Sequence, residues 1–218
     1  MYIHRILESK VRHLAEHFPV VMVCGARQVG KTTLLKKIAE ESKSIQYVTL
    51  DFPRNRQLAK ADPELFLQKY AAPLIIDEIQ HAPELLTYIK IRVDEKGENG
   101  MYYLAGSQMF HMMRNVGETL AGRMAVLSMY SLSGAEMEGR ESRPFNPAEI
   151  ERFDSEDTVT GVFDRILRGG MPRLINDADI SSEEYYGSYM QTYIERDIRD
   201  LISIRDESKF VKFPCPRS

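Results

Sequence analysis

Short apolar runs alternate with longer amphipathic stretches along the first 130 residues. Residues 3–18 repeat apolar side chains at helical spacing, which predicts a helix that Pro19 ends. Five short runs have the apolar character of buried strands: 20–24, 45–50, 74–76, 102–105 and 125–129. Helical patterns follow Gly30, Asp62 and Pro83. Strands that alternate with helices predict an α/β fold, with a parallel sheet covered on both sides.

The pattern changes after residue 138. Residues 139–157 are charged and contain prolines, which favours a linker. Two helices are expected beyond it, one through residues 162–167 and one that begins near Ser181 and carries a stripe of tyrosines. At helical spacing this stripe favours ordinary packing over an aromatic binding surface. We therefore predict an α/β core at 1–138, a linker at 139–157 and a helical region at 158–218.

Composition narrows the class of protein. Of the 218 residues 43% are hydrophobic and 28% charged, which is typical of a globular chain. The net charge of −3 gives no general attraction for nucleic acid, although it does not exclude a local basic groove. Cys24 and Cys215 suggest no disulfide framework, and no apolar run is long enough for a membrane span. We expect a cytoplasmic protein with no membrane partner.

The loop after the first apolar run carries the clearest chemistry. Residues 25–32 read GARQVGKT and match the phosphate-binding pattern G-x-x-x-x-G-K-[ST]. Backbone N–H groups of such a loop cradle phosphates, and the following helix N-terminus favours their charge. Lys31 adds a cation, and the Thr32 hydroxyl is suited to Mg²⁺. The predicted nucleotide-binding residues are Gly25, Ala26, Arg27, Gln28, Val29, Gly30, Lys31, Thr32 and Thr33.

An acidic pair ends the third apolar run. Asp77 and Glu78 follow Leu74-Ile75-Ile76, and the carboxyl end of a parallel strand faces the same crevice as the phosphate loop. We predict that Asp77 shares Mg²⁺ with Thr32 and that Glu78 is the general base for an attacking water. The alternative is a solvated acidic strand end. The chain has no N-K-x-D motif for guanine, so ATP is the expected nucleotide.

Two further residues are candidates for catalysis. Ser107 or Gln108, after the fourth run, could orient the γ-phosphate and the water, with Ser107 favoured and a helix cap as the alternative. Arg123 could be an arginine finger that acts in its own subunit or in a neighbour. The alternative is a surface arginine, and Arg114 is a weaker candidate for the finger.

The motifs together resemble those of prokaryotic AAA-type (AAA+) ATPases that carry a DUF4143-type C-terminal domain. The resemblance rests on the following segments: residues 25–35, 77–80, 106–107, 120–123, 169–172 and 193–198. It implies a sheet of order 5-1-4-3-2 and supports the roles of Lys31, Thr32, Asp77, Glu78 and Ser107. Members of this group usually continue through further domains. The end of this chain at Ser218 therefore implies a truncated member.

The function expected from these features is Mg²⁺-dependent ATP hydrolysis that drives a conformational change on an unknown protein partner. A nucleotide-dependent switch with little turnover and a DNA-associated ATPase are the alternatives. The sequence leaves open whether the chain forms a homo-oligomer.

Overall fold

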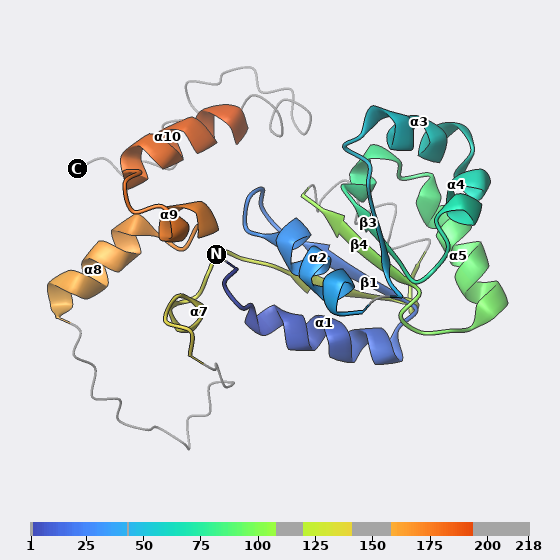
Figure 1. Ribbon diagram of the computed structural model, residues 1–218, viewed down its shortest axis with the longest axis horizontal. Coiled ribbons are helices and arrows are strands. Elements are labelled where there is room, and N and C mark those ends of the chain that lie inside the picture. Colours follow the sequence, from blue (N-terminus) through green and yellow to red (C-terminus); the bar gives the residue numbers. More distant parts are fainter. Residues whose placement is uncertain (1, 43, 108–119, 141–157, 194–218) are drawn as a thin grey trace.

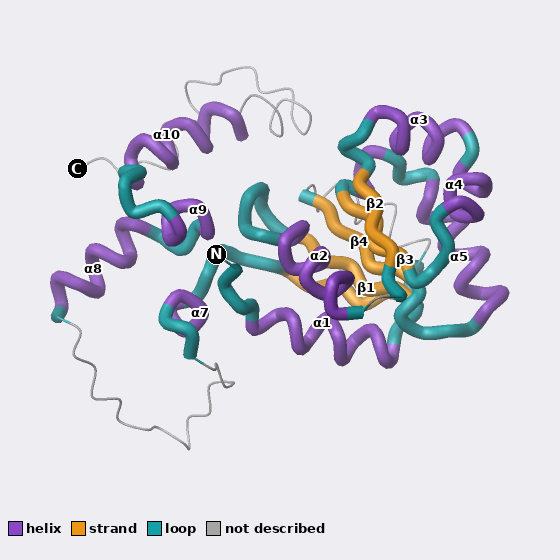
Figure 2. The backbone as a smooth tube through the Cα atoms, viewed as in Figure 1, coloured by secondary structure: helices purple, strands orange, loops and turns teal. Residues whose placement is uncertain are grey.

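Five parallel strands form the centre of the molecule. The computed structural model describes residues 2–42, 44–107, 120–140 and 158–193. The strands are β1 (Val20–Cys24), β2 (Gln46–Thr49), β3 (Leu74–Asp77), β4 (Tyr102–Gly106) and β5 (Met124–Ser128), and their order is β2-β3-β4-β1-β5 (Figures 1 and 2). This arrangement confirms the predicted α/β fold and the order 5-1-4-3-2. It places β1 between β4 and β5, so the loop after β1 lies near the middle of the carboxyl edge.

Helices cover both faces of the sheet, and the three strands β1, β3 and β4 bury all of their residues. Val21 and Val23 of β1 pack with α1 (Ile6–His17) and α2 (Lys31–Glu41). Val20, Met22 and Cys24 point to the opposite face. The helices on that face are α3 (Pro53–Ala61), α4 (Pro63–Lys69) and α5 (Leu85–Lys96). The result is a three-layer α/β/α sandwich.

Local signals set several helix boundaries. The Asp62 carboxylate accepts a hydrogen bond from the backbone N–H of Leu65 at 2.9 Å and so caps α4. Gly97 adopts a left-handed conformation where α5 ends. Ser133 caps α7 (Gly134–Met137) in a reciprocal capping box. Helix α3 and the 3₁₀ turn η1 (Ile79–His81) were not predicted; α3 buries only Ala59 and so has hardly any apolar periodicity.

The C-terminal helices lie beyond the loop that precedes α2 (Figure 1). They are α8 (Val159–Arg168), α9 (Pro172–Asn176) and α10 (Ser182–Tyr193). Met171, Leu174 and Tyr185 belong to the same apolar cluster as the residues beneath α1 and α2. The backbone of Gly170 accepts a hydrogen bond from the Leu132 N–H at 2.7 Å. A Cβ atom at Gly170 would lie 2.2 Å from the Leu132 carbonyl oxygen, so this close approach requires glycine.

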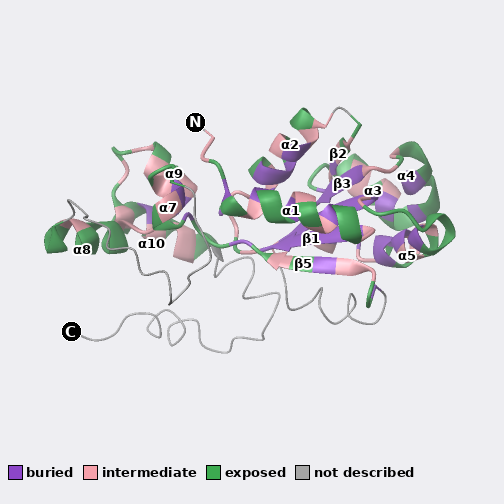
Figure 3. Cartoon of the chain, turned by 90° about the horizontal axis from the view of Figure 1, so that it is seen from below, coloured by how far each residue is buried: buried purple, intermediate pink, exposed green. Residues whose placement is uncertain are grey.

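Helix α8 differs from its neighbours. Its predicted packing residues Val162, Phe163, Ile166 and Leu167 are exposed among the described residues, whereas buried positions concentrate in and around the sheet (Figure 3). The predicted linker lies largely outside the described residues, which resume at Thr158. Within the described part of the chain, no helix combines the length and apolar character needed to cross a membrane.

Candidate nucleotide-binding site

The loop after β1 folds tightly against the strand beside it. A Cβ atom at Gly25 would lie 2.1 Å from the carbonyl oxygen of Met129, so only glycine fits there. Gly30 has φ of 103°, a left-handed conformation immediately before α2 begins at Lys31. The loop therefore delivers the chain from a buried strand end to a helix N-terminus, whose free N–H groups favour anions.

The Lys31 side chain lies inside this loop. It is 5% exposed, and its Nζ donates to the carbonyl oxygens of Gly25 at 2.9 Å and Ala26 at 2.7 Å. Burial lowers the pKa of Lys31, while the negative charges of Glu78 and Asp77 act in the opposite direction. A buried ammonium that carbonyl dipoles only partly compensate is a favourable position for an anion.

Asp77 links the loop to the end of β3. Its Oδ2 accepts hydrogen bonds from Thr32 Oγ1 at 2.7 Å and from the Tyr47 hydroxyl at 2.9 Å. The carboxylate is 2% exposed, and all the donors that bond it are neutral. A hydroxyl and a carboxylate oxygen in contact are hard ligands of the kind that Mg²⁺ prefers. Thr32 and Asp77 thus fit the metal site predicted for them.

Glu78 and Ser107 meet at the same edge through a third side chain. The Gln80 Nε2 donates to Glu78 Oε2 and to Ser107 Oγ, the latter at 3.2 Å. Glu78 itself has φ of 56°, a left-handed conformation that is uncommon for a residue with a side chain. Gln108, the alternative to Ser107, lies outside the described residues.

A cavity of about 650 Å³ opens over the loop, within the size range of small-molecule sites. Its walls come from the loop, from Glu78 and from the C-terminal helices: Arg27, Gln28, Gly30, Lys31, Thr32, Thr33, Glu78, Pro172, Arg173, Asn176 and Thr192. A neighbouring cavity of about 180 Å³ shares part of this wall and adds Tyr2, Ile3, Arg5 and Leu132. The loop, Glu78 and the C-terminal helices therefore line two adjacent cavities that share wall residues.

Side chains hold the loop from two directions. The Tyr185 hydroxyl of α10 donates to Gln28 Oε1 at 2.9 Å, and the Tyr189 hydroxyl donates to the Arg27 carbonyl oxygen at 3.3 Å. Beneath the loop, Arg5 Nη1 donates to the carbonyl oxygen of Val29 at 2.8 Å. The loop is thus tied both to the C-terminal helices and to the segment before α1.

Comparison with known families agrees with this geometry. A family model described as AAA domain matches residues 17–138, more than half of the chain. The chain belongs to the AAA domain family. A second model, a domain of unknown function (DUF8612), matches residues 160–214. The C-terminal match is therefore to DUF8612, where the resemblance implied a DUF4143-type domain.

Two sequence relatives extend the comparison. The chain is 26% identical over 196 residues to the uncharacterized proteins Mb2031c of Mycobacterium bovis and Rv2008c of Mycobacterium tuberculosis. The alignment covers 88% of this chain but only 39% of each relative. The chain therefore spans about two fifths of the length of these relatives.

Two solved structures share the fold. The Walker-type ATPase paby2304 of Pyrococcus abyssi has a TM-score of 0.56 at 15% identity, covering 92% of this chain and 75% of that one. AMPPCP-bound DnaA from Aquifex aeolicus has a TM-score of 0.51 at 16% identity, covering 89% and 64%. At these identities the likeness shows the P-loop AAA-type fold alone.

Arg123 of this AAA domain lies far from the loop within its own chain. It directly precedes β5, whose first residue pairs with Val20 at the start of β1, whereas the loop follows the last residue of β1. Five residues of strand separate the two sheet edges, on the order of 16 Å. Arg123 Nε pairs with Asp94 Oδ1 at 2.5 Å instead. This placement does not fit a finger that acts within its own chain, while a finger supplied to a neighbouring subunit stays a prediction. Arg114 lies outside the described residues.

Three residues at the candidate site were missed from the sequence. Tyr47 bonds Asp77, Gln80 bonds Glu78 and Ser107, and Arg173 lines the main cavity. Arg173 follows the segment 169–172 that contributed to the family resemblance, which was a signal for it. Gln80 lies within the matched segment 77–80 but lacked an assigned role. Tyr47 had no signal, because its role depends on β2 lying beside β3.

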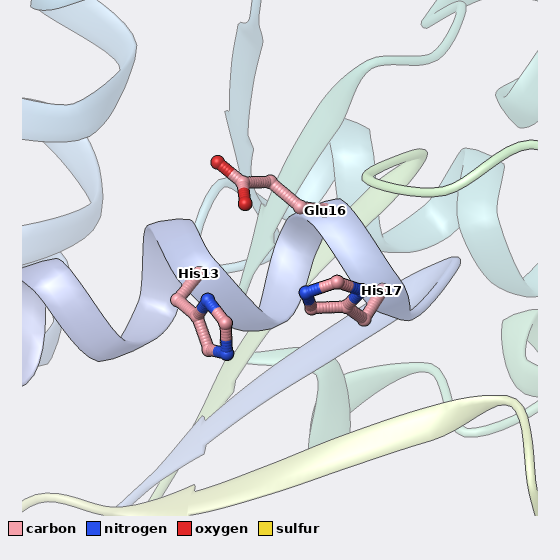
Figure 4. Close-up of side chains that lie close together, drawn as sticks. All are labelled: His13, Glu16 and His17. Carbon is pink, nitrogen blue, oxygen red and sulfur yellow. The ribbon is translucent and has the colours of Figure 1, made fainter.

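Two other groups of side chains do not contribute to this site. His13, Glu16 and His17 of α1 place potential ligand atoms within 4.8 Å of one another (Figure 4). All three are exposed, and His17 ends the helix that leads to the start of β1, at the edge opposite the loop. Cys24 is buried just before the loop, and burial raises the pKa of its thiol to about 11, so the thiol stays protonated at neutral pH.

Proposed function

We propose that this AAA domain binds ATP together with Mg²⁺ over the loop of residues 25–32 and hydrolyses it. The observation that carries the proposal is the hydrogen bond between Thr32 Oγ1 and Asp77 Oδ2, beside the buried Lys31. This hydrogen bond connects the first turn of α2 to the last residue of β3. Bringing a hydroxyl, a carboxylate and an ammonium together here suits a metal-bound triphosphate.

Each group has a separate role in binding. The loop N–H groups and Lys31 bind phosphate oxygens, and Thr32 with Asp77 would hold Mg²⁺, which supplies neutralisation of phosphate charge. Tyr47 keeps Asp77 oriented through its own hydrogen bond. The adjoining cavity, with Tyr2, Ile3 and Leu132, offers mostly apolar contacts suited to a base. The absence of a guanine-reading motif favours adenine.

Hydrolysis requires a base and a means to orient the water. Glu78 lines the main cavity, so its carboxylate is placed to accept a proton from an attacking water. Ser107 lies beside it through Gln80 and can orient the water or a phosphate oxygen. Arg173 comes from α9 and lines the same cavity, so it can add a second cation opposite Lys31.

The C-terminal helices are the natural route by which a nucleotide would affect the rest of the protein. They contact the loop through Tyr185 and Tyr189 and contribute Arg173 to the cavity wall. A change of loop conformation on hydrolysis would therefore alter their packing. We propose that this movement acts on a protein partner, which can be a further copy of the chain in a homo-oligomer.

Single substitutions test the proposal. Lys31→Ala should abolish binding of a fluorescent ATP analogue, while Glu78→Gln should retain binding and reduce steady-state phosphate release by about 100-fold or more. Glu84→Gln is the matched control, because Glu84 is an exposed glutamate just before α5. Phosphate release that is equal in wild-type protein and Glu78→Gln would rule out the assigned base.

A nucleotide-dependent switch is the second candidate function. The contacts of Tyr185 and Tyr189 with the loop favour it, since they would respond to nucleotide binding without turnover. Tight ATP binding with phosphate release no faster than that of Lys31→Ala would favour the switch over the hydrolase.

A further inference from the structure

Gln80 occupies a central position between the two residues assigned to the water. It lies in η1, directly after β3, and Ser107 follows the last residue of the adjacent strand β4. One amide nitrogen of Gln80 contacts both Glu78 Oε2 and Ser107 Oγ. A side-chain amide has two N–H donors, so these contacts use both of them.

The remaining atom of this amide is unusual. Gln80 Oε1 is buried and is the one buried side-chain polar atom that lacks a hydrogen-bond partner in the described parts of the chain. A buried acceptor without a partner lowers the stability of the folded state. An apolar side chain of the same length would avoid that loss, so folding stability does not explain a glutamine at this position. A buried polar atom without a partner in a native protein needs an explanation, and a role in catalysis is one of those available.

We propose that Gln80 is a positioning residue, which holds the Glu78 carboxylate and the Ser107 hydroxyl in a single arrangement for hydrolysis. The proposal rests on the proposed function of the same site. Gln80 does not touch the reacting atoms; it acts through the two residues that do.

The donor pattern explains how such positioning works. Gln80 occupies Oε2 of Glu78, which leaves Oε1 free to accept a proton from water. It also donates to Ser107 Oγ, so the hydroxyl hydrogen of Ser107 is directed to another acceptor, such as the water or a phosphate oxygen. The orientations of the Glu78 carboxylate and of the Ser107 hydroxyl are therefore set before the substrate binds. Preorganised groups avoid the cost of ordering during the reaction.

Lys31 gives Glu78 a competing partner. The two side chains are close enough for their charges to interact, and both line the main cavity. Without the hydrogen bond from Gln80, the attraction of the ammonium would draw the carboxylate toward Lys31. Such a contact would compete with the water for the base and with phosphate for the lysine. Gln80 therefore keeps the two opposite charges available for separate tasks.

The substitution Gln80→Met tests the proposal, because methionine has a similar length and no hydrogen-bond donor. We expect kcat for ATP hydrolysis to fall by about tenfold, while KM and the affinity for a non-hydrolysable ATP analogue change by less than about twofold. The thermal unfolding midpoint should stay the same or rise, because the unpaired Oε1 is removed.

Gln68→Met is the matched control. Gln68 is exposed on α4 and also contacts a glutamate, with its Nε2 at 3.4 Å from Glu64 Oε1. It should leave kcat, KM and the unfolding midpoint unchanged. In a Glu78→Gln background, Gln80→Met should lower kcat by less than it does in the wild type, because the base that it positions has already been removed and only its contact with Ser107 remains to be lost.

The outcomes separate this proposal from the proposed function. An unchanged or raised kcat in Gln80→Met, with Glu78-dependent turnover in the wild type, overturns the role of Gln80 and leaves the hydrolase intact. If the fall in kcat is accompanied by weaker analogue binding or by a lower unfolding midpoint, Gln80 has a structural role, and the positioning role is overturned. A wild type without Glu78-dependent turnover removes the hydrolase, and the role of Gln80 with it.

Discussion

Two buried carboxylates contact the phosphate loop region in different ways. Asp77 bonds Thr32 and Tyr47, and every donor that bonds it is neutral. Glu136 instead pairs with the buried Arg5, at 3.0 Å between Nε and Oε1, and accepts from two backbone N–H groups. Both side chains are less than 8% exposed. The charge of Glu136 is compensated within the protein, whereas the charge of Asp77 remains available for a cation.

The difference separates a structural ion pair from the proposed metal-binding site. Arg5 connects Glu136 to the Val29 carbonyl oxygen of the loop and to the Tyr130 carbonyl oxygen. This network holds the loop from below, and its two charged side chains are paired with each other. The Asp77 site has hydroxyl donors that can rotate when a metal arrives. A buried carboxylate that is hydrogen-bonded only by neutral donors is therefore the better indicator of a binding site.

The largest effect should come from breaking the compensated pair. Arg5→Met should lower the free energy of unfolding by about 3–5 kcal/mol, because it leaves Glu136 buried without a cation. Urea denaturation followed by circular dichroism measures this change. The double variant Arg5→Met/Glu136→Gln should recover part of the loss. A loss as large in the double variant as in the single one would contradict the pair as the cause.

Asp77→Asn should have the opposite effect, with little change in stability and a large loss of activity. Removing the uncompensated charge should change the free energy of unfolding by less than about 1 kcal/mol. It should lower kcat/KM for ATP hydrolysis by about 100-fold, or about 2.7 kcal/mol of transition-state stabilisation, because the metal ligand is lost. Asp94→Asn is the matched control at the opposite sheet edge. A strongly destabilised Asp77→Asn would remove the contrast with Glu136.

The pH dependence of stability sharpens the comparison further. Burial alone would raise the pKa of Glu136, but hydrogen bonds from Ser133 and Ile6 and the charge of Arg5 hold it below its usual 4.5. A depressed pKa in the folded state adds stability above the unfolded pKa, and this contribution is lost as the pH falls below about 4.5.

Glu136→Gln should therefore have a free energy of unfolding that falls less steeply than that of the wild type between pH 6 and pH 3. Urea denaturation at each pH gives the two curves. Asp94→Asn, which removes an exposed carboxylate, serves as the control and should follow the wild-type slope. Parallel curves for Glu136→Gln and wild type would contradict the linkage.

The smallest effect is expected at the exposed pair of Arg123 and Asp94. Both side chains are more than one third exposed, so water screens their interaction. Arg123→Ala should change the free energy of unfolding by less than about 1 kcal/mol and leave kcat unchanged for the isolated chain. A drop in kcat that appears only at protein concentrations where copies associate would instead support a finger supplied to a neighbouring subunit.

The accuracy of the sequence predictions depended on how local each signal was. Residues 20–24 were predicted as a strand and are β1, because a continuous apolar run reports burial on both faces. The fifth strand was displaced by one residue, at Met124–Ser128 rather than 125–129. Helix α3 was missed because its nine residues carry hardly any apolar periodicity. The apolar face of α8 was identified, but its expected packing is not present among the described residues.

The residues of the candidate site also differ in how local their sequence signals are. The loop of residues 25–32 and the acidic residues 77–78 were found because each is a contiguous pattern whose chemistry needs fixed spacing. Gln80 lay within a recognised segment, yet its role depends on Ser107 from another strand. Arg123 was left open between its own chain and a neighbouring subunit, and only the pairing of β5 with β1 places it at the sheet edge opposite the loop.

By itself the sequence determined the phosphate loop, the acidic strand end, the parallel sheet and its order, since these follow from local apolar patterning and a family resemblance. Only the tertiary structure decided which distant groups share a carboxylate: Arg5 with Glu136, 131 residues apart, and Tyr47 with Asp77, 30 apart. The physical reason is that side-chain hydrogen bonds act over about 3 Å. Whether two residues come that close depends on the packing of the whole chain, which no local pattern contains.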